Sequence, residues 1–223
     1  MIDASDVAIT ILTGARPDLL DRTLSSILSF EEGLLETGWI CVLHNGSDDP
    51  TDLVLEHRLK RIDRFRRTRD LLPIGPATSI LAEEAQGSGR RFWLHLEDDW
   101  MATGDHPGWL EIARALLRDD DEIAQVRLRR SSEKVLARHM VTRRPISWRE
   151  EGPFWISPDA HYTNNPSLIR AEEASLAWPA GGEKEAQGRW HGAGRKIVAQ
   201  LDPGVFIHLG DDRSLRKETG SPL

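Results

Sequence analysis

Three consecutive carboxylates, Glu97, Asp98 and Asp99, follow the apolar segment 92–96. Adjacent acids repel one another, so a stable arrangement needs a source of positive charge. Mg²⁺ or Mn²⁺ would supply it, because these ions prefer oxygen ligands and are commonly held by one or two carboxylates together with substrate phosphates. The competing interpretation is a group of solvent-exposed loop acids. If the segment stays extended, Glu97 and Asp99 face one side and Asp98 faces the other.

The elements that must position these acids alternate between strand and helix patterns over the first 130 residues. We expect strands at 6–13, 39–45, 60–68, 90–97 and 121–130, and helices at 17–30, 51–59, 75–86 and 107–119. This alternation predicts an α/β fold with a mostly parallel sheet flanked by helices. Ligands bind at the carboxyl ends of such strands, so Thr13, Asn45 and the three acids should meet at one edge of the sheet.

The second half of the chain is less regular and rich in Trp, Pro and Gly, with a late strand expected at 204–210. We see no repeat, low-complexity tract or linker, and therefore expect one domain over residues 1–223. Cys41 is the single cysteine and is expected to be a buried core residue. The N-terminus lacks a signal-peptide pattern, and no apolar run approaches the roughly 20 residues of a membrane span. These features predict a cytoplasmic protein without a membrane span, and they leave its oligomeric state open.

Charge is unevenly distributed along a chain whose net charge is −7. Residues 58–69 contain seven basic residues and one acid, and residues 127–149 contain eight basic residues and one acid. Two solvated faces would explain these windows, and so would a basic surface for phosphates on an otherwise acidic protein.

Taken together, several segments of the chain resemble those of one family, the nucleotide-sugar glycosyltransferases of the GT-A fold, nearest in style to family 2. The resemblance spans nearly the whole chain. Its fragments are "TGARPDLLDRTLSSIL" (13–28), "VLHNGSDD" (42–49), "IGPATSILAEEA" (74–85), "LEDDW" (96–100), "NNPSLIR" (164–170) and "GVFIHLGDDRS" (204–214). The order and spacing of these fragments carry the resemblance.

The resemblance implies a nucleotide-sugar-binding half at 1–100 and an acceptor-side half at 101–223, with Mn²⁺ or Mg²⁺ as cofactor. Asp99 is the first expected metal ligand, His208 closes the ion from the other side, and Glu97 is second or acts through water. The expected nucleotide-sugar contacts are Thr13, Gly14, Arg16, Asn45, Gly46, Gly75, Ser79, Glu97, Asp98 and Arg213. The chain departs from the family at His44, which replaces the acid that usually reads the base.

The implied reaction moves a sugar, hexosyl or N-acetylhexosaminyl, from a UDP-sugar to an acceptor hydroxyl. An inverting reaction needs a carboxylate base near the acceptor. By its spacing to the segment 194–201, Glu183 matches the family's base position, Glu185 is the runner-up and Asp159 is a third candidate.

The acceptor is the part that the sequence defines least. The residues that would face it are Arg129, Arg130, Arg143, Arg144, Trp148 and Trp155. Basic side chains neutralise phosphates and aromatic rings stack on bases, so hydroxymethylated DNA is one candidate. A glycan, a lipid phosphate and a protein are equally compatible. Two other functions stay open: a nucleotidyltransferase, although the Gly-rich loop with a Lys after the first strand is absent, and a non-catalytic nucleic-acid-binding protein.

Overall fold

The computed structural model describes residues 2–46, 48–130, 144–160, 162–163, 166–177 and 183–209. Its strands are β1 (Val7–Thr13), β2 (Trp39–His44), β3 (Arg64–Arg67), β4 (Phe92–Glu97), β5 (Trp100–Ala102), β6 (Ile123–Arg127), β7 (Arg149–Glu151), β8 (Phe154–Ser157), β9 (Ser167–Arg170), β10 (Ile197–Leu201) and β11 (Phe206–His208). Its helices are α1 (Pro17–Phe30), α2 (Leu34–Thr37), α3 (Asp49–Arg58), α4 (Ile74–Gly87), α5 (Trp109–Asp119), the short 3₁₀ helix η1 (Ala171–Glu173), α7 (Ala174–Ala177) and α8 (Glu183–Gly192).

Nine of the strands form one sheet in the order β3-β2-β1-β4-β9-β6-β10-β8-β7. Only β9 and β8 run against the rest, because β9 is antiparallel to both β4 and β6, and β8 is antiparallel to both β10 and β7. The expected mostly parallel α/β sheet is confirmed. The antiparallel β9 separates β4 from β6, an insertion that the strand–helix alternation does not reveal.

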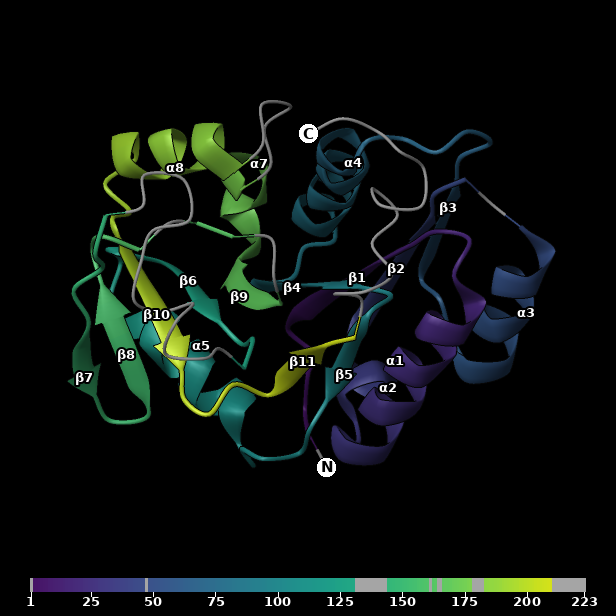
Figure 1. The fold of residues 1–223 in the computed structure, drawn as a ribbon, viewed down its shortest axis with the longest axis horizontal. Helices are drawn as coiled ribbons and strands as arrows, with labels where there is room; N and C mark the ends of the chain where they lie inside the picture. The colour runs from purple at the N-terminus through teal and green to yellow at the C-terminus, as the bar shows by residue number, and fades with distance from the viewer. Residues whose placement is uncertain are drawn as a thin grey trace.

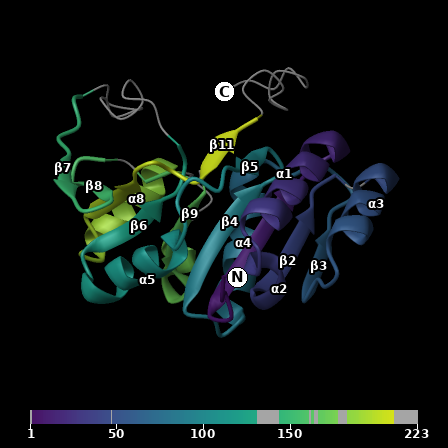
Figure 2. The ribbon, with the colours of Figure 1, turned by 90° about the horizontal axis from the view of Figure 1, so that it is seen from below.

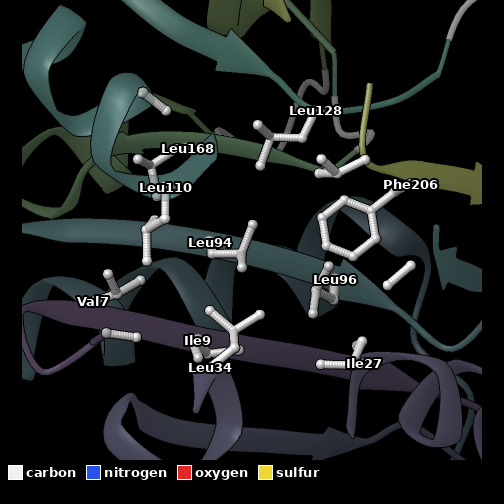
Figure 3. Close-up of a cluster of buried hydrophobic side chains, with 14 of the residues drawn as sticks. Val7, Ile9, Ile27, Leu34, Leu94, Leu96, Leu110, Leu128, Leu168 and Phe206 are labelled. Carbon is white, nitrogen blue, oxygen red and sulfur yellow. The ribbon is translucent and has the colours of Figure 1, made fainter. Parts of the chain in front are cut away.

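Helices cover both faces of the sheet (Figure 1). The face toward α1, α2 and α5 carries the larger core cluster, in which Ile9 and Leu94 of the sheet meet Ile27 and Leu34 of these helices (Figure 3). The face toward α4, α7 and α8 carries a second cluster that includes Trp93 and Trp190. Alternating apolar side chains on β1 and β4 therefore feed two cores, which explains why both strands are almost fully apolar.

Local sequence explains where several elements begin and end. Pro17 occupies the first turn of α1, where its missing N–H leaves no hydrogen bond unmade. Asp48 caps α3 by accepting a hydrogen bond from the Thr51 backbone N–H at 2.8 Å. Gly108 has a φ of 80°, and α5 starts directly after it, two residues later than expected. Cys41 is buried in β2, as expected.

A second, two-stranded sheet pairs β5 with β11, antiparallel, with His208 opposite Trp100. It lies beside the end of β4 in both ribbon views (Figures 1 and 2). Phe206 anchors it, because its ring is fully buried and packs at 6.2 Å, edge to face, on Trp109. This sheet places β11 next to the turn at residues 98 and 99, which we call the acidic turn. Within the described ranges, no helix has both the length and the apolar character that a membrane crossing requires.

Candidate functional site

Residues at and just after the end of β1 hold the acidic turn between β4 and β5 in place. Asp98 is fully buried and accepts hydrogen bonds from the Thr13 hydroxyl at 3.1 Å and from the Gly14 backbone N–H at 3.0 Å. The Arg16 guanidinium forms an ion pair with Asp98 and reaches Asp99 Oδ2 at 2.9 Å. Asp98 and Asp99 thus share Arg16. The expected alternation of the three acids is wrong after Glu97, because residues 98 and 99 form a turn.

His208 reaches the same turn from β11. Its Nε2 lies 3.4 Å from Asp99 Oδ2, and the Leu209 backbone N–H donates a hydrogen bond of 2.7 Å to the Asp99 carbonyl. The imidazole also packs on Trp100, with ring centroids 4.7 Å apart. Two residues 109 positions apart are therefore fixed side by side by strand pairing, a backbone hydrogen bond and a ring contact.

Burial and neighbouring charge move the pKa values of these groups in different directions. Burial, followed by the charges of Asp99 and Asp98, raises the pKa of Glu97 to about 8. Burial also raises the pKa of Asp98, although Arg16 opposes this. For Asp99, burial acts in the same direction but is outweighed by the hydrogen bond with His208 and by Arg16, so its pKa lies below the ordinary value. Asp99 is therefore the acid of this turn that is best prepared to stay ionised.

The residues of this turn fit a divalent cation. Asp99 Oδ1 is buried and has no hydrogen-bond partner among the described residues, and a buried carboxylate oxygen without a partner is an open ligand position. Two ligand atoms of an octahedral ion, each about 2.1 Å from it, lie about 3 Å apart, and Asp99 Oδ2 lies 3.4 Å from His208 Nε2. In the described part of the chain, no three His, Cys, Asp or Glu side chains are grouped to hold a metal. Two protein ligands with the remaining positions filled by phosphate and water match the usual binding of Mg²⁺.

The turn after β2 is built as a clamp on the loop that leads to α4. The Asn45 side chain donates to the Leu72 carbonyl at 2.9 Å and accepts from the Leu72 N–H at 2.8 Å and the Thr68 hydroxyl at 3.0 Å. The Gly46 N–H donates to the same hydroxyl at 2.9 Å, and Gly46 has a φ of 72°. The Asn45 side chain and the Gly46 N–H therefore fix residues 68–72.

His44 replaces an acid and has a defined proton position. Its Nε2 accepts a hydrogen bond from the Asp48 N–H at 3.2 Å, so the proton sits on Nδ1, which lies 2.8 Å from Asp52 Oδ1. The side chain is fully buried. Gly75 and Ser79 lie on α4, with Gly75 buried in its first turn.

The three expected bases lie on elements other than β4 and β5, with Glu183 and Glu185 on α8 and Asp159 just after β8. Glu183 is the first residue of α8, and Glu185 is exposed and pairs with Arg189 at 2.6 Å. Asp159 is exposed just after β8. Arg213 lies outside the described residues, as does Arg143.

The described acceptor residues fall into separate places. Arg129 lies over the Trp100 ring at 5.5 Å, which places it on the ring that also packs against His208. Arg130 pairs with Asp105 at 2.6 Å. Trp155 donates to Asp202 at 3.1 Å. Trp148 lies 5.9 Å from the guanidinium of Arg127, and Arg144 is exposed. The contact of Arg129 with Trp100 reaches the residue that directly follows Asp99.

A row of polar side chains, of which the sequence analysis singled out only Trp155, crosses the sheet next to this turn. Strand register places in one line Thr10, His95, Ser167, Arg127, Gln200 and Trp155. Arg127 and Gln200 are buried, and Gln200 Nε2 donates to the Arg129 carbonyl at 2.7 Å while its Oε1 has no partner among the described residues. We name this set the polar row. Polar residues at alternate positions of the expected strand 121–130 were its one visible signal.

The first basic window is largely neutralised by acids of the neighbouring helices. Arg58 pairs with Asp21 at 2.6 Å, and Arg64 and Arg66 both pair with Glu84. Arg67 pairs with Asp52 on α3, and Lys60 with Glu36 on α2. These pairs favour the interpretation of residues 58–69 as a solvated, ion-paired face rather than a phosphate-binding surface.

Comparison with solved structures identifies the fold. The mannosyltransferase PcManGT from Pyrobaculum calidifontis, in complex with GDP-Man and Mn²⁺, matches 98% of this chain with a TM-score of 0.63 and 12% identity. Glucosyl-3-phosphoglycerate synthase from Mycobacterium tuberculosis, with Mn²⁺ and UDP, matches 96% with a TM-score of 0.54 and 16% identity. TarS 1–349 from S. aureus matches 92% with a TM-score of 0.58 and 13% identity.

The chain spans 62%, 75% and 60% of these three proteins, respectively. No family model matches the sequence, and no curated protein matches it. The nine-stranded sheet, its acidic turn and these structural matches together show that the chain has the GT-A fold of the nucleotide-sugar glycosyltransferases.

Proposed function

We propose that this protein is a metal-dependent glycosyltransferase that moves a sugar from a nucleoside diphosphate sugar to an acceptor hydroxyl. The observation that carries the proposal is the pairing of Asp99 and His208 at the carboxyl edge of the sheet, with a buried Asp99 oxygen left open. Mn²⁺ or Mg²⁺ held there would neutralise the charge of the leaving diphosphate. Structural neighbours with Mn²⁺ and nucleotide ligands support the same assignment.

The donor binds in the half formed by residues 1–100. UDP is the first nucleotide to test, since TarS and the M. tuberculosis synthase were both solved with UDP, and GDP is the second, since the mannosyltransferase holds GDP-Man. Thr13 and Gly14 position Asp98, and Asn45 and Gly46 fix the loop 68–72. We assign these four residues to shaping the nucleotide site, and keep Gly75, Ser79, Glu97 and Arg213 as further donor contacts.

The chemistry is a displacement at the sugar's anomeric carbon. The bond from this carbon to the diphosphate oxygen breaks, a bond to the acceptor oxygen forms, and the acceptor proton passes to a carboxylate base if configuration inverts. Glu183 stays the first candidate for this base. Glu185 is weaker because it is exposed and already paired with Arg189, and Asp159 is the third candidate.

We infer that the acceptor binds beside the end of the polar row formed by Arg127, Gln200 and Trp155, where Trp155 is the partly exposed member. Gln200 is buried and its Oε1 has no partner among the described residues, so an acceptor hydroxyl that pairs with it must first displace the side chains that cover it. The Arg127 guanidinium lies 5.9 Å from the ring centroid of Trp148, which directly precedes β7. A sugar hydroxyl of a glycan suits this arrangement.

Hydroxymethylated DNA is the second acceptor class, supported by the Arg129–Trp100 and Arg127–Trp148 contacts. A base in duplex DNA would have to be flipped out to react. The ion pairing of residues 58–69 confines this support to the second basic window, of which Arg143 lies outside the described residues.

A thermal-shift series with UDP and GDP, each with Mn²⁺ or EDTA, tests the proposal. We expect stabilisation only when nucleotide and metal are both present, and its loss in Asp99→Ala and His208→Ala. Asp105→Ala, which removes a surface pair with Arg130, is the matched control. Binding of nucleotide that is indifferent to EDTA and to both substitutions would contradict the proposal.

Product analysis separates the alternatives. Release of nucleoside diphosphate from the donor supports a glycosyltransferase, whereas release of pyrophosphate supports a nucleotidyltransferase. Strong DNA binding that weakens steeply with salt, without any nucleotide-sugar effect, supports a non-catalytic nucleic-acid-binding protein. Offering oligosaccharides and hydroxymethylated DNA side by side distinguishes the acceptor classes.

A further inference from the structure

The side chain of Arg16 is bonded to two carboxylates of this protein, Asp98 and Asp99. Its guanidinium bonds to both carboxylates of the acidic turn, with Nε and a terminal nitrogen on Asp98 and the other terminal nitrogen on Asp99 Oδ2. Its side chain is only 12% exposed. These contacts give Arg16 a role in the acidic turn besides the expected nucleotide-sugar contact.

The backbone fixes Arg16 at this position. It is the residue directly before α1, its N–H bonds to the Gly14 carbonyl at 2.9 Å, and its carbonyl accepts from Leu20 at 3.1 Å. The strand β1 and the helix α1 are both anchored in the large core. The guanidinium is thus presented to the acids by a rigid support rather than by a surface loop.

Two neighbouring buried carboxylates destabilise the folded protein unless a positive charge lies nearby. Arg16 supplies one such charge whether or not a metal is bound. A divalent cation on Asp99 would sit close to the same guanidinium, and two positive charges repel each other. Binding of the metal alone is therefore opposed by Arg16, whereas a diphosphate brings negative charge that offsets both.

We propose that Arg16 is a positioning residue that acts as an internal counter-ion of the acidic turn, so that the turn stays folded without metal and the metal binds together with the nucleoside diphosphate. This inference rests on the proposed function. It predicts positive coupling between metal and nucleotide, with each ligand raising the affinity for the other by the same factor.

The test measures Mn²⁺ binding, by the electron paramagnetic resonance signal of free Mn²⁺, with and without UDP. In the wild type we expect Mn²⁺ to bind at least tenfold more tightly with UDP than alone. In Arg16→Met, Mn²⁺ alone should bind at least tenfold more tightly than in the wild type, and the effect of UDP should shrink. Arg16→Lys keeps the charge but loses the forked bonds to the two carboxylates, so its affinity for Mn²⁺ alone should lie closer to the wild type than that of Arg16→Met.

Thermal unfolding gives a second readout that does not depend on activity. Without metal, Arg16→Met should melt well below the wild type, and Mn²⁺ alone should restore most of the loss. Arg58→Met, which removes a pair with Asp21 on the surface, is the matched control and should show neither effect. If Arg16→Met does not fold without metal, refolding in Mn²⁺ must rescue it, and failure of that rescue overturns the inference.

The outcomes separate the inference from the function on which it rests. If the wild type binds Mn²⁺ and UDP together but Arg16→Met binds Mn²⁺ alone no more tightly than the wild type, the counter-ion role is wrong and the proposed function stands. If the wild type binds no Mn²⁺ with either UDP or GDP, the proposed function fails and the inference fails with it.

Discussion

Asp98 and Asp99 are neighbours in sequence, but we expect Asp98 to stabilise the fold and Asp99 to bind the metal. Truncating each residue to alanine should separate these two roles. Asp98→Ala removes the acceptor of the Thr13 hydroxyl, the Gly14 N–H and the Arg16 guanidinium, all at a fully buried carboxylate. Removing one partner of a buried ion pair costs about 3–5 kcal/mol. For a domain of this size, 1 kcal/mol lowers the melting temperature by about 2–4 °C. A cost near the middle of that range lowers it by roughly 12 °C.

Asp99→Ala should cost far less, because one Asp99 oxygen has no partner among the described residues and Arg16 keeps its bonds to Asp98. We expect a net loss of about 1 kcal/mol, because the substitution removes a buried ion pair but also the cost of a buried carboxylate oxygen that has no partner among the described residues. The same substitution should abolish the stabilisation by Mn²⁺ and UDP.

Urea denaturation in EDTA gives both free energies of unfolding, and thermal shifts with Mn²⁺ and UDP give ligand binding. Asp21→Ala, which removes a partly exposed pair with Arg58, is the control and should change the free energy of unfolding by less than about 1 kcal/mol. If Asp99→Ala proved as destabilising as Asp98→Ala, the assignment of separate roles would be wrong.

Three further predictions concern the support of the site. The fully buried His95 has its pKa lowered to about 3 by burial, so only the unfolded state gains its proton as the pH falls below about 6.5. Its contribution to stability is full above that pH and falls by about 2 kcal/mol between pH 7 and pH 5. The raised pKa of Glu97 acts in the opposite direction over this range, so the quantity to measure is the difference between the wild type and His95→Gln, which should narrow by this amount at pH 5. Gly204→Ala would drive a methyl group into the Arg129 backbone and displace β11, so it should lower stability and Mn²⁺–UDP binding together, whereas Gly192→Ala has open space and should change neither. Asn45→Ala removes three hydrogen bonds to residues 68–72, which should cost about 2–3 kcal/mol in urea denaturation and weaken UDP binding; unchanged UDP affinity would show that this loop does not shape the nucleotide site.

The sequence predicted the elements of the first 130 residues well because each has its own local signal. The strands β1, β2 and β4 are continuous apolar runs, and α1 and α4 begin at or near Pro. Boundaries shifted where the signal was weak: the strand expected at 60–68 is limited to the exposed β3. Three-residue strands such as β5 have no periodicity to detect, because their existence depends on a partner far along the chain.

The site was predictable to the extent that residue type alone reveals chemistry. The acids were identified from their run at the end of an expected strand and His208 from the resemblance, and the structure brings Asp99 and His208 together. The Arg16 ion pairs, the Asn45 clamp and the polar row were not, because each depends on which strands become neighbours. Register is a non-local property: Ser167 meets both His95 and Arg127 only because β9 is inserted between β4 and β6.

The pairing of β5 with β11 also has a consequence for the order of folding. It joins Trp100 to His208 and so closes a loop of more than 100 residues. Closing this loop costs conformational entropy, and the few hydrogen bonds of the two short strands must offset that cost. An ion bound by both Asp99 and His208 would hold the two ends of this loop together. Nucleotide occupancy and attachment of the late strand would then be thermodynamically linked, and backbone amides at 206–208 would exchange with deuterated solvent more slowly as the donor concentration rises.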